Sequence, residues 1–305
     1  MSFTSNIKNE ISKLKSERTE TIAQLSVILK NNANIGDTIK ITTENASVAR
    51  YVFSSIKDLY GISSKISVRK GYNYTKNFIY VLEISKKIND IIKDLSLDTN
   101  IPKDFIIDDD LNKRAYLRGL FISCGSINDP KKSRYHLEFF VDNEEYANFI
   151  KGLLNEYYLN SKVIKKNQKY MIYVKEAEKI GDFLRMINAI NALFYYEDIR
   201  IYRDHKNMTN RLNNCEQANV DKIIATATNQ VNDIKVIEDA GGLDLLNEKE
   251  SIAATYRLKY PEASLVELSQ IISLETDTEI TKSGLYHRFN KIKELANRIR
   301  ANSKE

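Results

Sequence analysis

The 305-residue sequence has no tryptophan, three prolines and only two cysteines. Two cysteines, Cys124 and Cys215, are too few for a disulfide framework, so we expect a reducing compartment. The sequence also lacks an uninterrupted apolar run of the roughly 20 residues that a membrane-spanning helix needs. Its first ten residues include charged side chains where a signal peptide would be apolar. These absences predict a cytoplasmic protein that does not bind a membrane.

Residue patterns that hold a metal or a cofactor are also missing. The three histidines, His136, His205 and His287, are scattered, and no two have the spacing of a zinc site. There is no glycine-rich phosphate-binding loop, and no Ser or Cys lies in a nucleophile elbow. The sequence therefore predicts no metal, no cofactor and no conventional catalytic motif.

The remaining composition is typical of a globular protein. Charged residues make up 29% of the chain and hydrophobic residues 42%. A chain of this length can form two or three domains, each with its own core. The net charge of +5 is too small to indicate a nucleic-acid partner by itself.

The chain contains an internal repeat. Residues 117–127 (LRGLFISCGSI) match residues 25–35 (LSVILKNNANI), 92 positions earlier. Both segments have the pattern of a buried helix, followed by small or polar residues and an Ile that can start a strand. Residues 52–66 match 149–163 at an offset of 97, which fits a longer loop at 128–132. A repeat of this length indicates a duplicated domain, because the units of a solenoid are far shorter.

Residues 117–127 resemble the LAGLIDADG helix of homing endonucleases. Two wider segments, 113–119 (KRAYLRG) and 210–219 (NRLNNCEQAN), resemble the WhiA family of bacterial regulators. The resemblance covers essentially the whole chain. It implies an α+β fold of two degenerate LAGLIDADG-like αββαββα repeats, followed by a connector helix and an all-α helix-turn-helix domain. It also implies a DNA-binding transcriptional regulator, associated with the nucleoid, that acts in cell division and chromosome segregation.

We expect this organisation to divide the chain into four segments. They are a first repeat at 1–100, a second repeat at 101–205, a connector helix at 206–245 and a helix-turn-helix domain at 246–305. The hydrophobic pattern predicts further helices in both repeats, at 5–18, 45–60, 86–95, 143–158 and 177–188. It predicts strands at 38–43, 65–70, 77–83, 135–141, 162–166 and 169–174, with 71–74 joining the second and third of them. The C-terminal helices are expected at 247–259, at 264–272 and from about residue 282 onward.

Active LAGLIDADG enzymes carry an acidic residue just before the final Gly of each motif, and the two carboxylates hold a divalent metal. The corresponding positions here are Asn32 and Cys124, neither of which supplies the fixed negative charge that a hard cation needs. We therefore predict a protein that is not an enzyme, with Cys124 and Gly119 at a tight helix interface. Because Val27 replaces Gly119 in the first copy, the two helices should pack asymmetrically. The alternative is a metal-dependent endonuclease that uses unorthodox acids such as Glu138 or Asp129.

The C-terminal segment carries the strongest signal for DNA. Residues 281–304 include seven basic residues and one acid, opposite an apolar stripe, as expected of a recognition helix. Ser264 and Glu267 have capping-box spacing and should open the preceding helix. The turn expected at 273–280 is longer than the usual three or four residues. A solvated surface helix is the alternative interpretation. The candidate contacts with double-stranded DNA are Lys282, Ser283, Tyr286, His287, Arg288, Asn290 and Lys291.

Secondary DNA contacts are a further hypothesis. Strand alternation places Lys40, Lys65 and Arg69 on one sheet face, with Ile39, Ile41, Ile66 and Val68 on the other, packed on helices. Contact with phosphates and protection of an exposed sheet both explain these cations. Arg211, in the polar stretch 210–219, is another candidate, although helix packing or capping is favoured for most of that stretch. The repeats are alternatively a scaffold for another protein of the transcription or division machinery.

Overall fold

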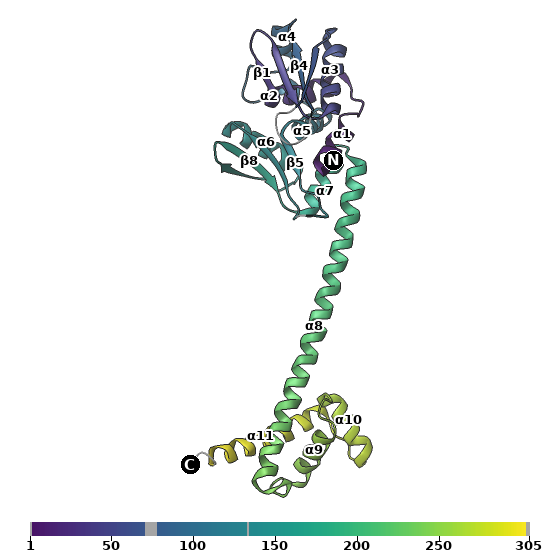
Figure 1. The fold of residues 1–305 in the computed structure, drawn as a ribbon, viewed down its shortest axis with the longest axis vertical. Helices are drawn as coiled ribbons and strands as arrows, with labels where there is room; N and C mark the ends of the chain where they lie inside the picture. The colour runs from purple at the N-terminus through teal and green to yellow at the C-terminus, as the bar shows by residue number, and fades with distance from the viewer. Residues whose placement is uncertain (1, 71–77, 133, 303–305) are drawn as a thin grey trace. The chain divides into compact units, whose positions relative to one another are not determined.

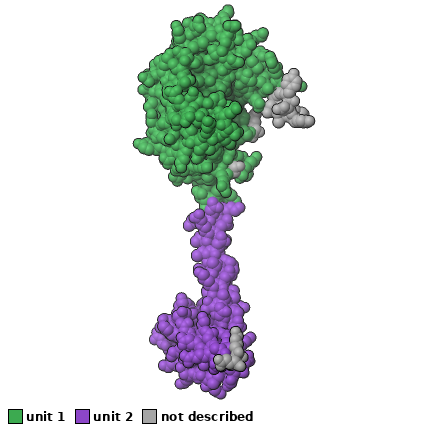
Figure 2. All heavy atoms as spheres, turned by 90° about the vertical axis from the view of Figure 1, so that its left-hand side faces the viewer, with its two compact units in different colours: residues 1–204 green, residues 205–305 purple. Residues whose placement is uncertain are grey.

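The computed structural model describes residues 2–70, 78–132 and 134–302, and the expected connection at 71–74 lies outside these residues. The chain divides into two compact units, residues 1–204 and residues 205–305, which Figure 2 shows in different colours. Each unit has its own hydrophobic core. No helix in the described part of the chain combines the length and the apolar character needed to cross a bilayer.

The first repeat of unit 1 is a four-stranded antiparallel sheet with helices. Its elements are α1 Phe3–Ile11, α2 Arg18–Asn32, β1 Ala33–Ile35, β2 Ile39–Thr43, α3 Ala46–Tyr60, β3 Lys65–Lys70, β4 Phe78–Ile84 and α4 Ile88–Asp94. The strand order is β1-β2-β4-β3, which places β3 at one edge.

The second repeat has the same order of strands along the chain and across its sheet. Its elements are α5 Asp110–Cys124, β5 Gly125–Ile127, β6 Leu137–Val141, α6 Glu144–Glu156, β7 Lys162–Lys166, β8 Lys169–Val174 and α7 Ala177–Met186. The sheet order β5-β6-β8-β7 repeats that of the first sheet. These two sheets with their helices confirm the predicted α+β class (Figure 1). Buried residues of both repeats form one hydrophobic core.

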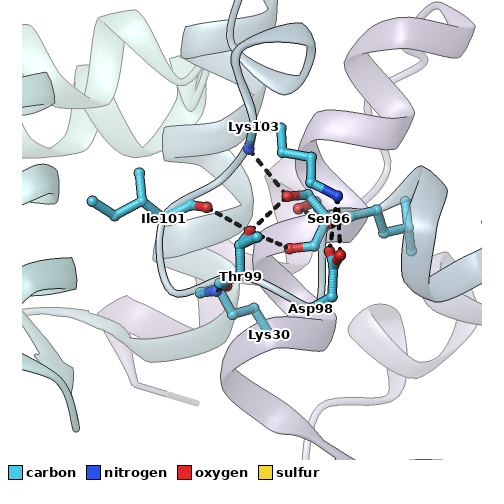
Figure 3. A network of polar contacts seen from close by, with 8 residues as sticks. Lys30, Ser96, Asp98, Thr99, Ile101 and Lys103 are labelled. Carbon is cyan, nitrogen blue, oxygen red and sulfur yellow. Dashed lines mark hydrogen bonds and ion pairs between the residues drawn. The ribbon is translucent and has the colours of Figure 1, made fainter.

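The segment that joins the two repeats is bound by polar contacts to the C-terminal part of α2 (Figure 3). The Ser96 hydroxyl accepts the Lys103 N–H at 3.0 Å and lies 2.9 Å from the Thr99 hydroxyl. The Lys103 ammonium lies 3.0 Å from an Asp98 carboxylate oxygen, and this hydrogen bond lowers the pKa of Asp98. Lys30, near the end of α2, donates to the carbonyl of Thr99. These contacts bind the connecting segment to α2 of the first repeat.

Two predictions for unit 1 were wrong. The helix expected at 5–18 ends at Ile11, and the chain then turns so that the Ser16 hydroxyl accepts a hydrogen bond from buried Arg118 at 3.1 Å. Ile66 and Val68 are not packed on helices but are 45% and 54% exposed. The reason is that α3 packs mainly over β2 and β4, which leaves the edge strand β3 uncovered.

The connector helix is longer than expected. Helix α8 runs from Ile190 to Gly241, so it begins inside the second repeat rather than near residue 206. The Glu10 carboxylate accepts the backbone N–H groups of Asn191 at 2.7 Å and Ala192 at 3.1 Å. A carboxylate at this end satisfies N–H groups that have no partner inside the helix and opposes the helix dipole.

Unit 2 combines the C-terminal part of α8 with three further helices. These are α9 Glu248–Lys259, α10 Leu265–Thr276 and α11 Lys282–Asn302. Ile234 and Ile237 of α8 contribute to the same buried core as Leu268, Leu285 and other residues of the three helices. Unit 2 is therefore all-α, as predicted.

The capping box that opens α10 is confirmed. The Ser264 hydroxyl accepts from the Glu267 N–H at 3.2 Å, and the Glu267 carboxylate accepts from the Ser264 N–H at 2.8 Å. The bounds predicted for the turn, 273–280, were wrong, because α10 continues to Thr276; the observed turn at 277–281 has five residues and is still longer than the usual three or four. The Ser273 hydroxyl accepts the Ile280 N–H at 2.9 Å, which closes the turn from inside the helix.

Candidate nucleic-acid interface and the paired-helix centre

The two motif helices, α2 and α5, pack against each other in the middle of unit 1 (Figure 1). A Cβ atom on Gly119 would lie 2.4 Å from the Gln24 carbonyl oxygen and 2.5 Å from Cγ1 of Val27. Both distances are far below van der Waals contact, so only glycine fits at this point. This confirms the prediction of a close, asymmetric interface, and the structure adds that Val27 of α2 faces Gly119 of α5.

The ends of these helices hold neutral side chains. The Asn31 amide of α2 donates to the Ser123 hydroxyl of α5 at 3.2 Å. The adjacent Cys124 thiol lies 3.5 Å from the Leu120 carbonyl oxygen, and burial raises its pKa to about 11. The thiol is therefore protonated at neutral pH and is a poor ligand for a hard cation.

An amine, rather than a carboxylate, lies close to this centre. The ammonium of Lys8 is 5.9 Å from the ring centre of Phe121 on α5, and burial lowers its pKa, an effect that the nearby Cys124 partly opposes. Among the residues that the structure describes, no three His, Cys, Asp or Glu side chains are grouped to hold a metal ion.

The acids considered as substitutes have other partners. A Glu138 carboxylate oxygen lies 3.1 Å from Nε2 of His136. The Asp129 carboxylate accepts from the Lys131 N–H at 2.9 Å and from the Tyr195 hydroxyl at 3.3 Å. Among the described residues neither acid forms a hydrogen bond or ion pair with Asn32 or Cys124, so the described geometry gives no pair of carboxylates at the helix ends.

Helix α11 presents polar side chains on one face and buries the other. Leu285, Phe289 and Ile292 are at most 3% exposed and hold the helix to the core of unit 2. Lys282, Ser283, Tyr286 and His287 are exposed, and Asn290 is half-buried. The first two lie in the first turn of the helix, where backbone N–H groups favour an anion. The structure thus places five of the seven predicted contacts on the outward side of α11.

The other two predicted contacts lie next to the start of α9. The Arg288 guanidinium donates to the Lys249 carbonyl oxygen at 3.4 Å, and the Lys291 ammonium is 3.8 Å from a Glu250 carboxylate oxygen. The Lys291 side chain is 67% exposed, so this ion pair is weak and leaves the ammonium accessible. Arg300, farther along α11, pairs instead with Asp233 of α8 at 2.8 Å.

The proposed secondary contacts belong to different units. Lys40 is 3.3 Å from the Glu83 carboxylate, and the strand register places Lys65 on the other side of Glu83. Lys65 and Arg69 are exposed on the edge strand β3. Arg211 is exposed on α8 in unit 2, and the whole stretch 210–219 is exposed rather than packed.

Two buried arginines were not identified from the sequence. Arg118 of α5 is 4% exposed, and its guanidinium donates to Ser16 and to the Ile187 carbonyl oxygen. Arg257 of α9 is 1% exposed and donates to the carbonyl oxygens of Tyr260 and Ala263. The sequence offered one signal for each of them. Arg118 follows Leu117 in an apolar helical pattern, and Arg257 follows Ala253 and Ala254 in another. A charge at a core position indicates a buried polar network.

A capping box at the start of α9 was also missed. The Asn247 side chain accepts the Glu250 N–H at 2.9 Å, and the Glu250 carboxylate accepts the Asn247 N–H. The pattern N-E-K-E, with Glu three residues after the cap, would have identified it.

The fold and these sites define a protein with two degenerate LAGLIDADG-like repeats and a C-terminal helix-turn-helix domain. Three family models match consecutive parts of the chain. The WhiA N-terminal LAGLIDADG-like domain matches residues 18–98, the WhiA LAGLIDADG-like domain matches 113–206, and the WhiA C-terminal HTH domain matches 209–296. The chain therefore belongs to the WhiA family.

Relatives match along their whole length. "Probable cell division protein WhiA" of Lactobacillus gasseri is 40% identical over 313 residues, which cover 98% of this chain and 99% of that protein. The protein of the same name from Clostridium botulinum is 41% identical over 318 residues and covers 98% and 99%. The crystal structure of full-length DUF199/WhiA from T. maritima has a TM-score of 0.58 at 24% identity and covers 98% and 99%. This last match supports the fold.

Proposed function

We propose that this protein is a non-catalytic, DNA-binding transcriptional regulator that acts on the nucleoid in cell division and chromosome segregation. The observation that carries the proposal is the outward side of α11, where Lys282, Ser283, Tyr286 and His287 are exposed while the opposite side forms the core. A helix of this kind fits the major groove of double-stranded DNA, with its N-terminal residues toward the bases.

The match to the WhiA C-terminal HTH domain and the names of the relatives support this proposal. Tyr286, His287 and Asn290 are the proposed base contacts, and Lys282 and Ser283 are the proposed phosphate contacts. Arg288 and Lys291 extend the cationic surface beside the start of α9. We assign DNA binding to residues 246–305 and regard residues 206–245 as the connector.

The proposal that the protein is non-catalytic is supported by the chemistry of the helix ends. A divalent metal needs carboxylate oxygens to offset its dehydration. Asn32 and the protonated Cys124, at the positions of the family's acids, provide none, and neither do the neighbouring Asn31 and Ser123. We propose that the paired helices keep the architecture of the repeats without a metal-dependent reaction.

A gel-shift assay with genomic DNA fragments tests the DNA-binding role. The double variant Arg288→Gln/Lys291→Gln should abolish duplex binding, and any residual binding should have a salt slope smaller by about two, because each phosphate contact contributes roughly 0.9. Lys235→Gln/Lys259→Gln is the matched control, since it removes two cations from the same unit, including one ion-paired with Glu275. Unchanged binding by the first variant would refute the role of this helix.

Incubation with Mg²⁺ and supercoiled plasmid tests the non-catalytic role. The plasmid should stay intact, whereas cleavage that disappears in Glu138→Ala would show that the protein is an endonuclease. A pull-down addresses the scaffold alternative, because partners retained after removal of residues 246–305 would show that the repeats bind protein.

A further inference from the structure

A cavity in unit 2 combines three cations with the start of a helix. Its volume is about 280 Å³, and it is lined by Lys222 of α8, Arg257 of α9, the first residues of α10, and Lys282 of α11. No Asp or Glu is among its lining residues. Three acids adjoin lining residues in the sequence, namely Asp221, Glu262 and Glu267. The Asp221 carboxylate accepts from the Gln217 amide at 2.9 Å, and the Glu267 carboxylate accepts from the Ser264 N–H at 2.8 Å and so completes the cap of α10.

The start of α10 contributes backbone donors to the cavity. Leu265 and Val266 line it, and they are the first two residues of a 12-residue helix. The N–H groups of the first helical residues have no acceptor within the helix, and the helix dipole gives this end a partial positive charge. The capping box provides acceptors for the N–H groups of Ser264 and Glu267, but not for those of Leu265 and Val266.

Arg257 is the second, independent sign of an anion. The residue is 1% exposed, yet no carboxylate pairs with its guanidinium in the part of the chain that the structure describes. Two bonds to the carbonyl oxygens of Tyr260 and Ala263 use Nη1, while Nε is buried without a hydrogen-bond partner among the described residues. Leaving a buried charge without a counter-ion is strongly unfavourable. Arg257 also lines the cavity, so an anion held there would lie beside the guanidinium and offset its charge.

We propose that this cavity binds a phosphate group of the DNA backbone and that the connector helix, through Lys222, is therefore part of the DNA-binding surface. A phosphate suits a site with several N–H donors, a guanidinium and ammonium groups. The position of Lys282 favours DNA as the source, because this residue also begins α11, the proposed recognition helix. The choice of DNA rests on the proposed function, whereas the phosphate chemistry of the cavity does not.

Fluorescence anisotropy with the full chain and a labelled duplex tests this proposal across a salt series. Lys222→Gln should weaken duplex binding by about tenfold, the effect of losing one charged hydrogen bond, and should reduce the salt slope by about one. Lys235→Gln is the matched control, because Lys235 is exposed on the same helix of the same unit but does not line the cavity. This control should change neither the affinity nor the slope.

A second arm separates the two sources of phosphate. The melting temperature of each variant is measured with millimolar inorganic phosphate or a mononucleotide, against chloride at equal ionic strength. If free phosphate does not raise the melting temperature and only Lys222→Gln binds the duplex more weakly, the cavity is a site for a phosphate of the DNA backbone. Stabilisation that Lys222→Gln removes, with unchanged duplex affinity, would assign the cavity to a free anion and overturn the choice of DNA.

Failure of the inference is distinct from failure of the proposed function. In one outcome, Lys222→Gln and Lys235→Gln both bind duplex DNA as tightly as the wild type, and phosphate does not change the melting temperature. This result would overturn the cavity as a phosphate site and leave DNA binding intact. No duplex binding by the wild type would refute the proposed function, and the melting experiment would still decide whether the cavity binds phosphate.

Discussion

The ends of the paired helices and the surface of α11 use polar residues in opposite ways. At the helix ends, Asn31 and Ser123 bind each other, and burial keeps the Cys124 thiol protonated. On α11, Lys282 and Ser283 are exposed at the start of the helix. Side chains that satisfy one another inside a fold stabilise it, whereas exposed cations remain available to a ligand. The helix ends of unit 1 therefore form an internally satisfied centre, whereas unit 2 exposes the cations to which the proposed function assigns DNA binding.

The largest expected effect concerns the closeness of the paired helices. Gly119→Ala should lower the free energy of unfolding by on the order of 3 kcal/mol, because the new Cβ overlaps a backbone carbonyl oxygen that cannot move freely. Gly152→Ala is the control, since nothing lies within 4 Å of a Cβ there and alanine favours the helix by up to about 1 kcal/mol. Denaturant unfolding measures both changes. Wild-type stability in Gly119→Ala would contradict the tight interface.

The alkylation rates of the two cysteines provide a direct comparison of the buried centre with the exposed helix. With a pKa of about 11, Cys124 is roughly one-thousandth thiolate at pH 8, and its sulfur is also shielded. Cys215 is exposed on α8, so iodoacetamide should modify it roughly a hundredfold faster. The thiolate fraction of Cys124 should rise about tenfold per pH unit up to its pKa. Mass spectrometry of the Cys124→Ser and Cys215→Ser variants assigns a modification rate to each cysteine. Equal rates in the folded chain would show that the reagent reaches the paired-helix centre freely.

A smaller effect is expected where α11 meets the connector helix. Arg300→Gln removes the 2.8 Å ion pair with Asp233, whose side chain is only 11% exposed. Because Arg300 itself is 41% exposed and solvent screens the pair, the loss of stability should be about 1 kcal/mol. Arg298→Gln changes an exposed cation on the same helix and should leave the melting temperature of unit 2 unchanged. A larger loss of stability in Arg298→Gln than in Arg300→Gln would contradict the ion pair between Arg300 and Asp233.

The smallest effect is expected on the sheet face of unit 1. Lys40 pairs with Glu83, and Lys65 lies on the other side of the same carboxylate, so this acid offsets one of the three cations on this face. The triple variant Lys40→Gln/Lys65→Gln/Arg69→Gln should weaken duplex binding less than about threefold, far less than the Arg288→Gln/Lys291→Gln variant. Equal losses in the two variants would mean that unit 1 contacts DNA as strongly as unit 2.

Local patterns predicted most of the elements. Alternation identified 65–70, 162–166 and 169–174 as strands with the observed bounds of β3, β7 and β8. The spacing of Ser264 and Glu267 located the start of α10, and the mid-helix position of Gly119 predicted a close contact. Each of these signals depends on residues within a few positions, and turn, strand and capping chemistry act at that range.

Other features depend on partners far away in the sequence. Arg118 meets the Ile187 carbonyl oxygen 69 residues later and Ser16, 102 residues earlier, and no local pattern indicates these contacts. The exposure of Ile66 and Val68 depends on which strands α3 covers. The candidate DNA contacts were named from the sequence, but their division into an outward group and a pair beside α9 was not foreseeable.

By itself, the amino-acid sequence determined the duplicated order of helices and strands, the neutral residues at the motif ends and the basic excess of the last helix. Those properties follow from residue type and periodicity. Only the tertiary structure decided that Val27 faces Gly119, that Glu10 caps α8, and that Lys222, Arg257 and Lys282 line one cavity. Charge and hydrogen bonding act through space, so their consequences depended on which distant segments the fold brought together.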